Sequence, residues 1–352
     1  MLLIDAHLDL AYNAINLGRD LTMTVAQERT NLREHSSLWR EEAGLITTTL
    51  PEIASQTPCL VCGTIFILPS NAKTTLDGVS YNSPREAHEQ AWQQFAWYEA
   101  QEQAGLIRIV KNKQDLAAVC ADDSSTAGLL VLMEGADGIR KPAELERWYN
   151  AGLRWLGLSW QQTRYAGGTG APGGLTLDGI ALLHFMEQLG VALDVSHLAE
   201  ESFWEALDLF HGHVAASHAN CRALLGTDHA DRYLSDAMID AVIARGGVIG
   251  LALFNKMLVP TWDGHKASVT FDHVMRHIDY VCNRAGDTLH VAIGSDFDGG
   301  FGREHVPAEI DTWRDIHKLA DALAAHGWQD SDIANVLGVN WQRWFERILP
   351  EA

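Results

Sequence analysis

The amino-acid sequence predicts an α/β protein built as a single (β/α)₈ barrel that spans residues 1–352. Eight short runs rich in apolar and β-branched residues recur along the chain, and stretches with helical periodicity lie between them. Unbroken apolar runs are typical of parallel strands, because helices cover both faces of such a sheet. Strands and helices that alternate in this order favour a closed barrel.

The strands are predicted from apolar runs and the helices from a period of 3.6 residues. The predicted strands are Leu2–Asp9, Cys59–Leu68, Gly128–Glu134, Leu153–Trp160, Val191–His197, His213–His218, Val248–Phe254 and His290–Asp296. The predicted helices are Ser83–Ala104, Pro142–Ala151, Gly179–Leu189, Glu200–Phe210, Asp236–Arg245, Phe271–Arg284, Thr312–Ala325 and Asp330–Leu349. Residues Asn13–Pro58 form the longest connection and are expected to add helical cover over one barrel face. Two doubly wound domains are the alternative, but no Gly-rich dinucleotide-binding fingerprint follows any strand.

Composition and charge narrow the class of partner. The chain is 47% hydrophobic and 20% charged, as in ordinary globular proteins, and its formal net charge is −20. Nucleic acids and anionic membranes carry the same sign, so no nucleic-acid or membrane partner is expected and small molecules are favoured. No apolar stretch of about 18 residues occurs, and Asp5 interrupts the amino terminus before a secretory segment could form. A cytoplasmic location is therefore predicted.

The five cysteines do not suggest a disulfide framework, because they are odd in number and scattered along a long chain. Cys59 and Cys62 form a CxxC pair inside an apolar run, with no second pair and no neighbouring histidine pair. We interpret these two residues as core packing in a protein whose thiols are reduced.

Metal-competent side chains end several of the predicted strands. Active sites of such barrels lie at the C-terminal ends of the strands. His7 and Asp9 end the first strand, where a period of two points both to one face, and Glu134, His197 and His218 end three others. A lone histidine at a strand end is more often structural, but five such residues together favour ligation of two zinc ions, with Glu134 able to bridge them. Two metals roughly 3.5–4 Å apart can share a hydroxide and polarise a carbonyl, which suits amide hydrolysis.

Beyond these ligands, Asp194 is expected to orient a neighbouring group rather than bind metal itself.

At these positions the sequence resembles the membrane (renal) dipeptidase family of zinc peptidases, M19, including its soluble bacterial members. The resemblance covers nearly the whole chain and rests on short motifs whose order and spacing together are specific. The motifs are Asp5-Ala6-His7-Leu8-Asp9, Glu134-Gly135, Asp194-Val195-Ser196-His197, Ser217-His218-Ala219-Asn220-Cys221-Arg222 and Gly294-Ser295-Asp296-Phe297-Asp298-Gly299.

The resemblance implies a binuclear zinc centre with His7 and Asp9 on one metal, His197 and His218 on the other, and Glu134 as the bridge. It also implies that Asp296 is the acid/base carboxylate and that Arg232, in Asp231-Arg232-Tyr233-Leu234-Ser235-Asp236, holds the terminal carboxylate of the substrate. Asp298, in the last motif, is taken as a further substrate-binding candidate. Since the family includes dimers, a homodimer is possible.

One position departs from the family pattern. After the fourth strand the family commonly has Leu-Thr-His-Asn, whose histidine is thought to steady the oxyanion, whereas this chain has Leu158-Ser159-Trp160-Gln161. An indole offers one neutral N–H donor and no exchangeable proton at neutral pH. We expect Trp160 to alter substrate preference rather than abolish activity, and packing in the pocket wall is an equally open interpretation.

The sequence therefore predicts a metal-dependent hydrolase, a zinc-dependent dipeptidase that cuts small dipeptides by a metal-bridging hydroxide. Whether its substrates include L-Xaa-D-Xaa dipeptides stays open. One alternative is another metal-dependent amidohydrolase, acting on N-acyl amino acids, lactones or cyclic amides. The other is a catalytically silent barrel that only binds a ligand.

Overall fold

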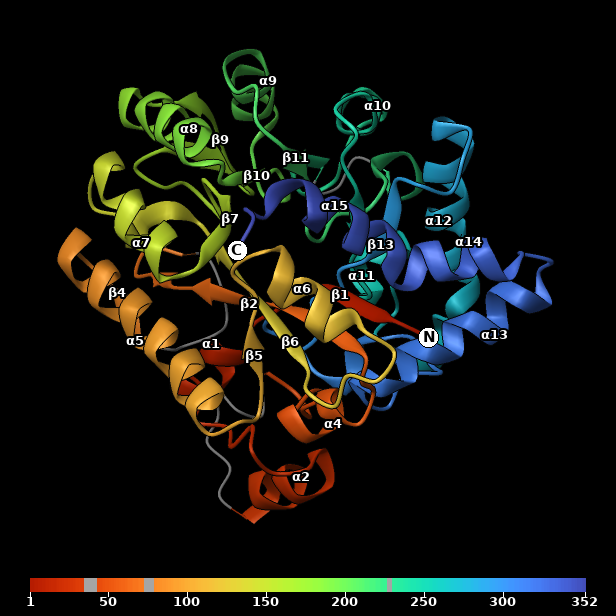
Figure 1. Ribbon diagram of the computed structural model, residues 1–352. Coiled ribbons are helices and arrows are strands. Elements are labelled where there is room, and N and C mark those ends of the chain that lie inside the picture. The colour runs from red at the N-terminus through yellow and green to blue at the C-terminus, as the bar shows by residue number, and fades with distance from the viewer. Residues whose placement is uncertain (35–42, 73–78, 227–229) are drawn as a thin grey trace.

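The computed structural model describes residues 1–34, 43–72, 79–226 and 230–352. Eight parallel strands form one sheet in the order β11-β10-β7-β6-β2-β1-β13-β12, and a parallel bridge between Ala216 and Ile249 joins its two ends. The sheet is thus a barrel, and Figure 1 shows the helices arranged around it. Strands from both halves of the chain lie in this one sheet, so the alternative of two doubly wound domains is wrong.

Each of the eight barrel strands overlaps a predicted strand. They are β1 (Leu3–Leu8), β2 (Cys59–Phe66), β6 (Gly128–Glu134), β7 (Leu153–Gly157), β10 (Ala192–Asp194), β11 (Val214–Ala215), β12 (Ile249–Leu251) and β13 (Val291–Ile293). Several end earlier than predicted: β10 stops at Asp194 and β11 at Ala215, so His197 and His218 lie in the loops that follow. These loops leave the sheet because the hydrogen-bonded ladder between neighbouring strands ends there.

The remaining strands are short and are additional to the eight strands of the barrel. β5 (Arg108–Ile109) pairs with the start of β6, while β3 (Leu68–Pro69) with β4 (Ser80–Tyr81) and β8 (Ala166–Gly168) with β9 (Ala171–Leu175) form small separate sheets.

The helices are α1 (Leu10–Ile15), α2 (Val25–Glu34), α4 (Leu50–Ala54), α5 (Pro84–Gln103), α6 (Lys113–Cys120), α7 (Leu145–Ala151), α8 (Leu177–Leu189), α9 (Glu200–Leu209), α10 (Asp236–Ala244), α11 (Asn255–Leu258), α12 (Phe271–Ala285), α13 (Lys318–Ala325), α14 (Asp330–Ala334) and α15 (Asn340–Ile348).

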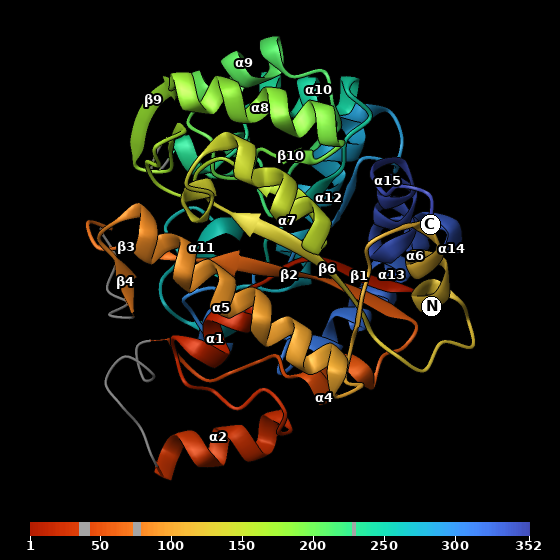
Figure 2. The same ribbon diagram turned by 60° about the vertical axis from the view of Figure 1, so that its left-hand side comes forward.

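All the predicted helices are present. The predicted segments Pro142–Ala151 and Thr312–Ala325 each begin with 3₁₀ turns before α7 and α13, and a π turn joins α14 to α15. Local chemistry explains the sharp starts, since the side chains of Ser83, Thr176 and Ser235 accept hydrogen bonds from the first turns of α5, α8 and α10. The connection Asn13–Pro58 does contain short helices. Of these, α1 packs on β2 and α5, whereas α2 lies outside the ring of helices (Figure 2).

The barrel interior has an apolar lower half. Trp155 of β7 packs inside the barrel against Trp341, Trp344 and Phe345 of α15, with ring centroids 5.3, 4.7 and 6.2 Å away. The helix α15 therefore closes the N-terminal end of the barrel.

The structure confirms that Cys59 and Cys62 pack in the core. Both are buried free thiols in β2, and they belong to different apolar clusters. Residues three apart in a strand point to opposite faces, so the two sulfurs face the helices and the barrel interior respectively.

Candidate metal centre

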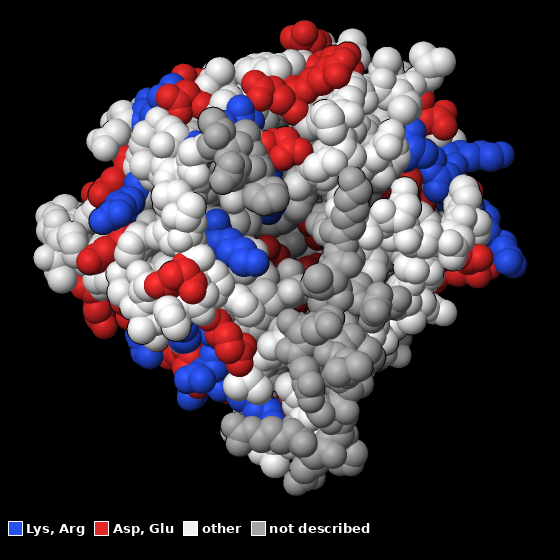
Figure 3. Space-filling view, turned by 180° about the vertical axis from the view of Figure 1, so that it is seen from behind, with Lys and Arg blue, Asp and Glu red and all other residues white. Residues whose placement is uncertain are grey.

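A cavity of about 320 Å³ lies at the C-terminal ends of the barrel strands. Figure 3 shows the hollow in this face, with acidic side chains at its floor. The residues that line it are Asp9, Tyr12, Phe66, Leu68, Glu134, Trp160, Thr169, His197, His218, Arg232, Tyr233, Phe254, Lys256, Met257, Asp296, Gly299, Gly300 and Phe301.

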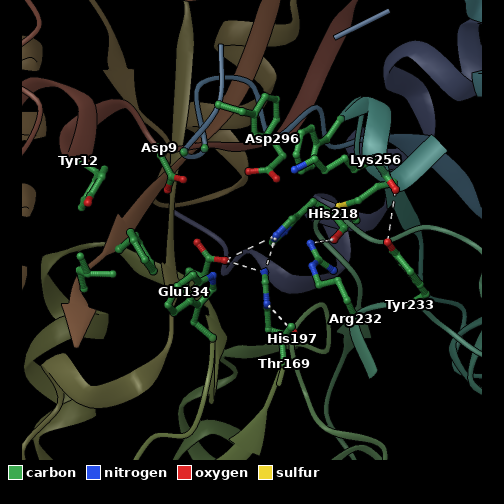
Figure 4. Close-up of a pocket in the computed structure, with 18 residues that line it drawn as sticks. Asp9, Tyr12, Glu134, Thr169, His197, His218, Arg232, Tyr233, Lys256 and Asp296 are labelled. Atoms are coloured by element: carbon green, nitrogen blue, oxygen red, sulfur yellow. Dashed lines mark hydrogen bonds and ion pairs between the residues drawn. The ribbon is translucent and has the colours of Figure 1, made fainter. Parts of the chain in front are cut away.

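Three imidazoles converge on the carboxylate of Glu134, and Figure 4 shows two of them, those of His197 and His218. The Nε2 atom of His7 lies 3.3 Å from one oxygen, and the Nε2 atoms of His197 and His218 lie 3.0 and 3.6 Å from the other. The last two nitrogens are only 2.9 Å apart. The structure thus brings together residues from four widely separated parts of the chain, and Glu134 stands between the two sides of the cluster.

A bulge in β1 aims His7 and Asp9 at this cluster. The pairing of β1 with β2 shifts between Asp5 and Leu8, because three steps along β1 match two along β2. Ile4 and Ala6 face the barrel interior below the bulge, so simple alternation would point His7 outward. The extra residue reverses the alternation and turns His7 and Asp9 inward, which is how bulges commonly re-aim side chains beside active sites.

A single hydroxyl group holds two of the histidines. The Oγ atom of Ser217 lies 3.2 Å from Nδ1 of His7 and 2.9 Å from Nδ1 of His218, and it donates its own hydrogen to Asp194. Since that hydrogen is used, the two lone pairs can accept N–H groups from both rings. This arrangement places the protons on Nδ1 and leaves each Nε2 free to bind a metal.

Asp194 lies behind this hydroxyl and is fully enclosed. It also accepts hydrogen bonds from the backbone N–H groups of Ser196 and Ser217, at 3.1 and 2.9 Å, and from the hydroxyl of Ser196, at 2.6 Å. This location fits the expected orienting position, because the carboxylate reaches the histidines through Ser217.

Two further threonines support the cluster, and the sequence did not single them out. Thr169 lies 2.9 Å through its hydroxyl from Nδ1 of His197, and the hydroxyl of Thr64 donates to Asp9. Thr169 sits in the turn between β8 and β9, in the run Ala166-Gly167-Gly168-Thr169-Gly170. That glycine-rich run after a strand was the one available signal.

Several carboxyl groups lie close together in this cluster, and burial opposes their ionisation. Burial, helped by the neighbouring charge of Glu134, raises the pKa of Asp9 to about 7, and burial holds the pKa of Asp296 well above its usual value. Burial also opposes ionisation of Glu134, but the charge of His7 and a hydrogen bond from His197 hold its pKa below the usual value. Burial would lower the pKa of His7, whereas Glu134 raises it to about 10.

These residues fit a pair of bound cations. Three carboxylates crowd a buried space around Nε2 of His7, which lies 3.3 Å from an oxygen of Glu134. Three overlapping groups could each hold an ion: His7 with Asp9 and Glu134, Glu134 with His197 and His218, and His7 with His218 and Asp296. Buried like charges are costly unless cations compensate them, and imidazole with carboxylate is the donor set of hydrolytic zinc sites.

Asp296 follows β13 in an unusual backbone conformation. Its φ of 60° lies in the left-handed region, as does the 62° of Asp298. Its carboxylate reaches within 4.0 Å of Nε2 of His7. A side chain at Gly299 would put its Cβ 2.0 Å from that carboxylate, so the glycine makes the space. Strained non-glycine residues that persist at a cavity are typical of functional sites.

Arg232 lies in the cavity wall and is largely buried. Its guanidinium donates to the backbone carbonyls of Ser196 and His218, each at 3.0 Å. Burial lowers its pKa from the usual value, and no ion pair joins it to any carboxylate of the described residues. Because a guanidinium carries five donor hydrogens, the remaining ones are available to an anion in the cavity.

Trp160 and Asp298 have different surroundings. The Trp160 ring lines the cavity, 5.1 Å from the Phe66 ring in an edge contact and 6.3 Å from His197.

Asp298 is buried, is absent from the cavity lining, and accepts hydrogen bonds from the backbone N–H groups of Thr47 and Thr48 at 3.0 and 2.9 Å. The geometry therefore does not support Asp298 as a substrate ligand, because its carboxylate instead anchors the loop after β13.

The family model for membrane dipeptidase, peptidase family M19, matches residues 1–349. The chain belongs to this family. The assignment agrees with the resemblance seen in the sequence, places the chain among metallo-dipeptidases by class, and implies a bound metal. Within the described parts of the chain, no helix combines the length and the apolar character needed to span a bilayer.

Several known proteins are similar to this chain in sequence or in structure. An uncharacterized protein of the pqqA 5′ region of Klebsiella pneumoniae is 32% identical over 270 residues, which cover 73% of this chain and 95% of that protein. The dipeptidase verJ of Clonostachys rogersoniana is 28% identical over 231 residues, covering 63% of this chain and 56% of that protein. A metallopeptidase of Rhodobacter sphaeroides, solved with a phosphinate mimic of the dipeptide L-Ala-D-Ala, has a TM-score of 0.79 at 22% identity, over 99% of both chains. The last likeness shows the fold.

Proposed function

We propose that this chain is a dipeptidase with two zinc ions. His7 and Asp9 would hold one ion, His197 and His218 the other, and Glu134 would bridge them. The observation that carries the proposal is the convergence of three imidazole nitrogens on the two oxygens of Glu134. They lie in the wall of a cavity that also holds Arg232, which forms no ion pair with a carboxylate in the part of the chain that the structure describes. The match to the dipeptidase family over residues 1–349 supports it and supports one catalytic domain over 1–352.

The chain's own residues divide the work of hydrolysis. When bound, zinc supplies a Lewis acid that polarises the scissile carbonyl and makes water a nucleophile near neutral pH. Arg232 would bind the terminal carboxylate of the dipeptide and so fix which bond lies over the cluster. Asp296 would accept the proton of the attacking water and pass it to the leaving amine.

Two features bear on substrate choice. The ligand of the Rhodobacter relative mimics a dipeptide with a C-terminal D-residue, which leads us to propose that L-Xaa-D-Xaa dipeptides are substrates of this chain as well. Trp160 stands where the family commonly has histidine, and its edge contact with Phe66 makes it part of an apolar wall. We propose that it shapes substrate preference by packing rather than by exchanging a proton.

Metal content and a dipeptide library test the proposal. Zinc-loaded protein should bind about two zinc ions per chain and hydrolyse free dipeptides, including L,D pairs, while a chelator should abolish turnover. Activity on N-acyl amino acids with none on free dipeptides would favour the alternative amidohydrolase. Protein without measurable zinc affinity would favour a ligand-binding barrel.

Arg232→Lys tests the carboxylate clamp. Losing the paired donors should raise the KM for dipeptides about tenfold or more, with little change for dipeptides whose C-terminus is amidated. Arg154→Lys is the matched control, because Arg154 is also buried and donates to backbone carbonyls, but it lies outside the cavity. An unchanged KM for free dipeptides in Arg232→Lys would contradict the clamp.

The cytoplasmic location and the homodimer stay predictions. The free thiols of all five cysteines support a reducing compartment. Size measurement by light scattering at micromolar concentration would decide the oligomeric state.

A further inference from the structure

The cavity has two chemically different sides, and the metal-binding cluster lies between them. Figure 4 shows Tyr12 on one side and Arg232, Tyr233 and Lys256 on the other. The side with Tyr12 is apolar, because the rings of Tyr12 and Trp160 both pack edge-on against Phe66 at 5.1 Å. The opposite side carries both of the basic residues in the cavity lining.

Lys256 extends from α11 into this second side (Figure 4). Its ammonium lies 5.9 Å from the ring of Phe254, which itself stacks on Phe301 with centroids 4.1 Å apart. Among the described residues, no carboxylate forms an ion pair with Lys256, although the chain carries 46 acidic residues against 26 basic ones. A lysine that lines a cavity without an anionic partner in so acidic a protein offers a place for an anion.

Tyr233 holds Arg232 and Lys256 on the same side of the cavity. Tyr233 follows Arg232 in the chain, and its hydroxyl donates to the backbone carbonyl of Lys256 at 3.4 Å. Tyr233 also packs in one small apolar cluster with Met257, the residue after Lys256. If Arg232 binds the terminal carboxylate of a dipeptide, the side chain of the same C-terminal residue lies near Lys256.

We propose that Lys256 binds the side-chain carboxylate of an acidic C-terminal residue. The preferred substrates are dipeptides with an apolar N-terminal residue, placed against Tyr12, Phe66 and Trp160, followed by aspartate or glutamate. This inference rests on the proposed function. Two cations on one side of the cavity then match the two carboxylates of that residue, and the apolar side disfavours the reversed order, because a carboxylate there would lose water without gaining a partner.

Three peptides separate these features on zinc-loaded protein: Leu-Glu, its neutral isostere Leu-Gln, and the reversed Glu-Leu. We expect kcat/KM for Leu-Glu to exceed that for Leu-Gln by about tenfold, mainly through KM, and Glu-Leu to be the poorest of the three. In Lys256→Gln the Leu-Glu to Leu-Gln ratio should fall to about one, whereas Lys256→Arg should keep most of it.

Lys141→Gln is the control for net charge, since it removes an exposed lysine outside the cavity and should leave the ratio unchanged. Hydrolysis of Leu-Gln with a wild-type ratio near one, or a ratio that survives Lys256→Gln, would overturn this inference and leave the proposed function standing. The same three peptides are also assayed with a D-configured C-terminal residue. If zinc-loaded protein cleaves no peptide of either set, the proposed function fails and the inference fails with it.

Discussion

The two ends of the barrel interior are equally buried but chemically opposite. At the N-terminal end, Trp155 and Trp341 are fully enclosed and pack against other aromatic rings. At the C-terminal end, His7, Glu134 and His218 are exposed by only 0%, 6% and 1%. Burial stabilises the first end through the hydrophobic effect, whereas it costs free energy at the second, where charged groups lose water.

The fold builds its stable apolar end and its polar site from the same strands. The same strands supply both ends: β7 provides Trp155 below and leads to Trp160 above, and β6 runs from apolar residues to Glu134. The aromatic end contributes stability that does not depend on metal, whereas the crowded carboxylates of the polar end would need the proposed cations to offset their charge. The two ends should therefore respond differently to mutation and to metal removal.

Trp341→Ala should give the largest loss of stability. It tests whether the apolar end stabilises the fold independently of metal. The change leaves a large void beside Trp155 and removes the donor that the indole offers the carbonyl of Ile293 at 2.8 Å. We expect the free energy of unfolding of metal-free protein to fall by about 3–5 kcal/mol, measured by urea denaturation. Zinc affinity of the folded protein should not change, and a parallel loss of zinc would show that the two ends are coupled.

Asp194→Asn should act at the polar end alone. The amide cannot replace a carboxylate that accepts four hydrogen bonds, so Ser217 would no longer be held as an acceptor for His7 and His218. We expect zinc affinity to fall about 10–100-fold, measured by competition with a chelating dye, with a smaller change in the stability of metal-free protein. Unchanged zinc affinity would contradict the orienting position of Asp194.

His277→Gln should have the smallest effect on stability, and this effect should depend on pH. His277 accepts a hydrogen bond from the N–H of Cys221 and donates one to the carbonyl of Leu258, so it buttresses two loops of the polar end from outside. Burial lowers its pKa to about 4. The unfolded chain takes up a proton near pH 6.5, so this contribution to stability is present above that pH and is lost as the pH falls toward 4.

The wild-type protein should therefore lose about 1 to 2 kcal/mol more than His277→Gln between pH 7 and pH 5, measured by urea denaturation. His184→Gln is the control, because His184 is exposed on α8 and touches neither loop. An equal loss in wild type and His277→Gln would contradict a neutral, buried His277.

Much of the barrel and of the candidate metal centre could be predicted because their signals are local. Apolar runs and capping residues such as Ser83 and Ser235 depend on neighbours in the sequence, which is why strands and helices lie where expected. The strand ends were less accurate, since a parallel ladder stops where neighbouring strands part. Residues such as Thr64 and Lys256 gave no local signal, because their significance depends on what lies across the cavity.

The sequence by itself determined the order of strands and helices, the apolar lower barrel, and which acidic and imidazole residues stand beyond the strands. Only the tertiary structure decided where those side chains point. The bulge between Asp5 and Leu8 turned His7 inward, the Ser217 hydroxyl joined His7 to His218 of the loop after β11, and Asp298 turned away toward Thr47. Periodicity repeats within one segment, whereas direction at a strand end depends on its register with the neighbouring strand.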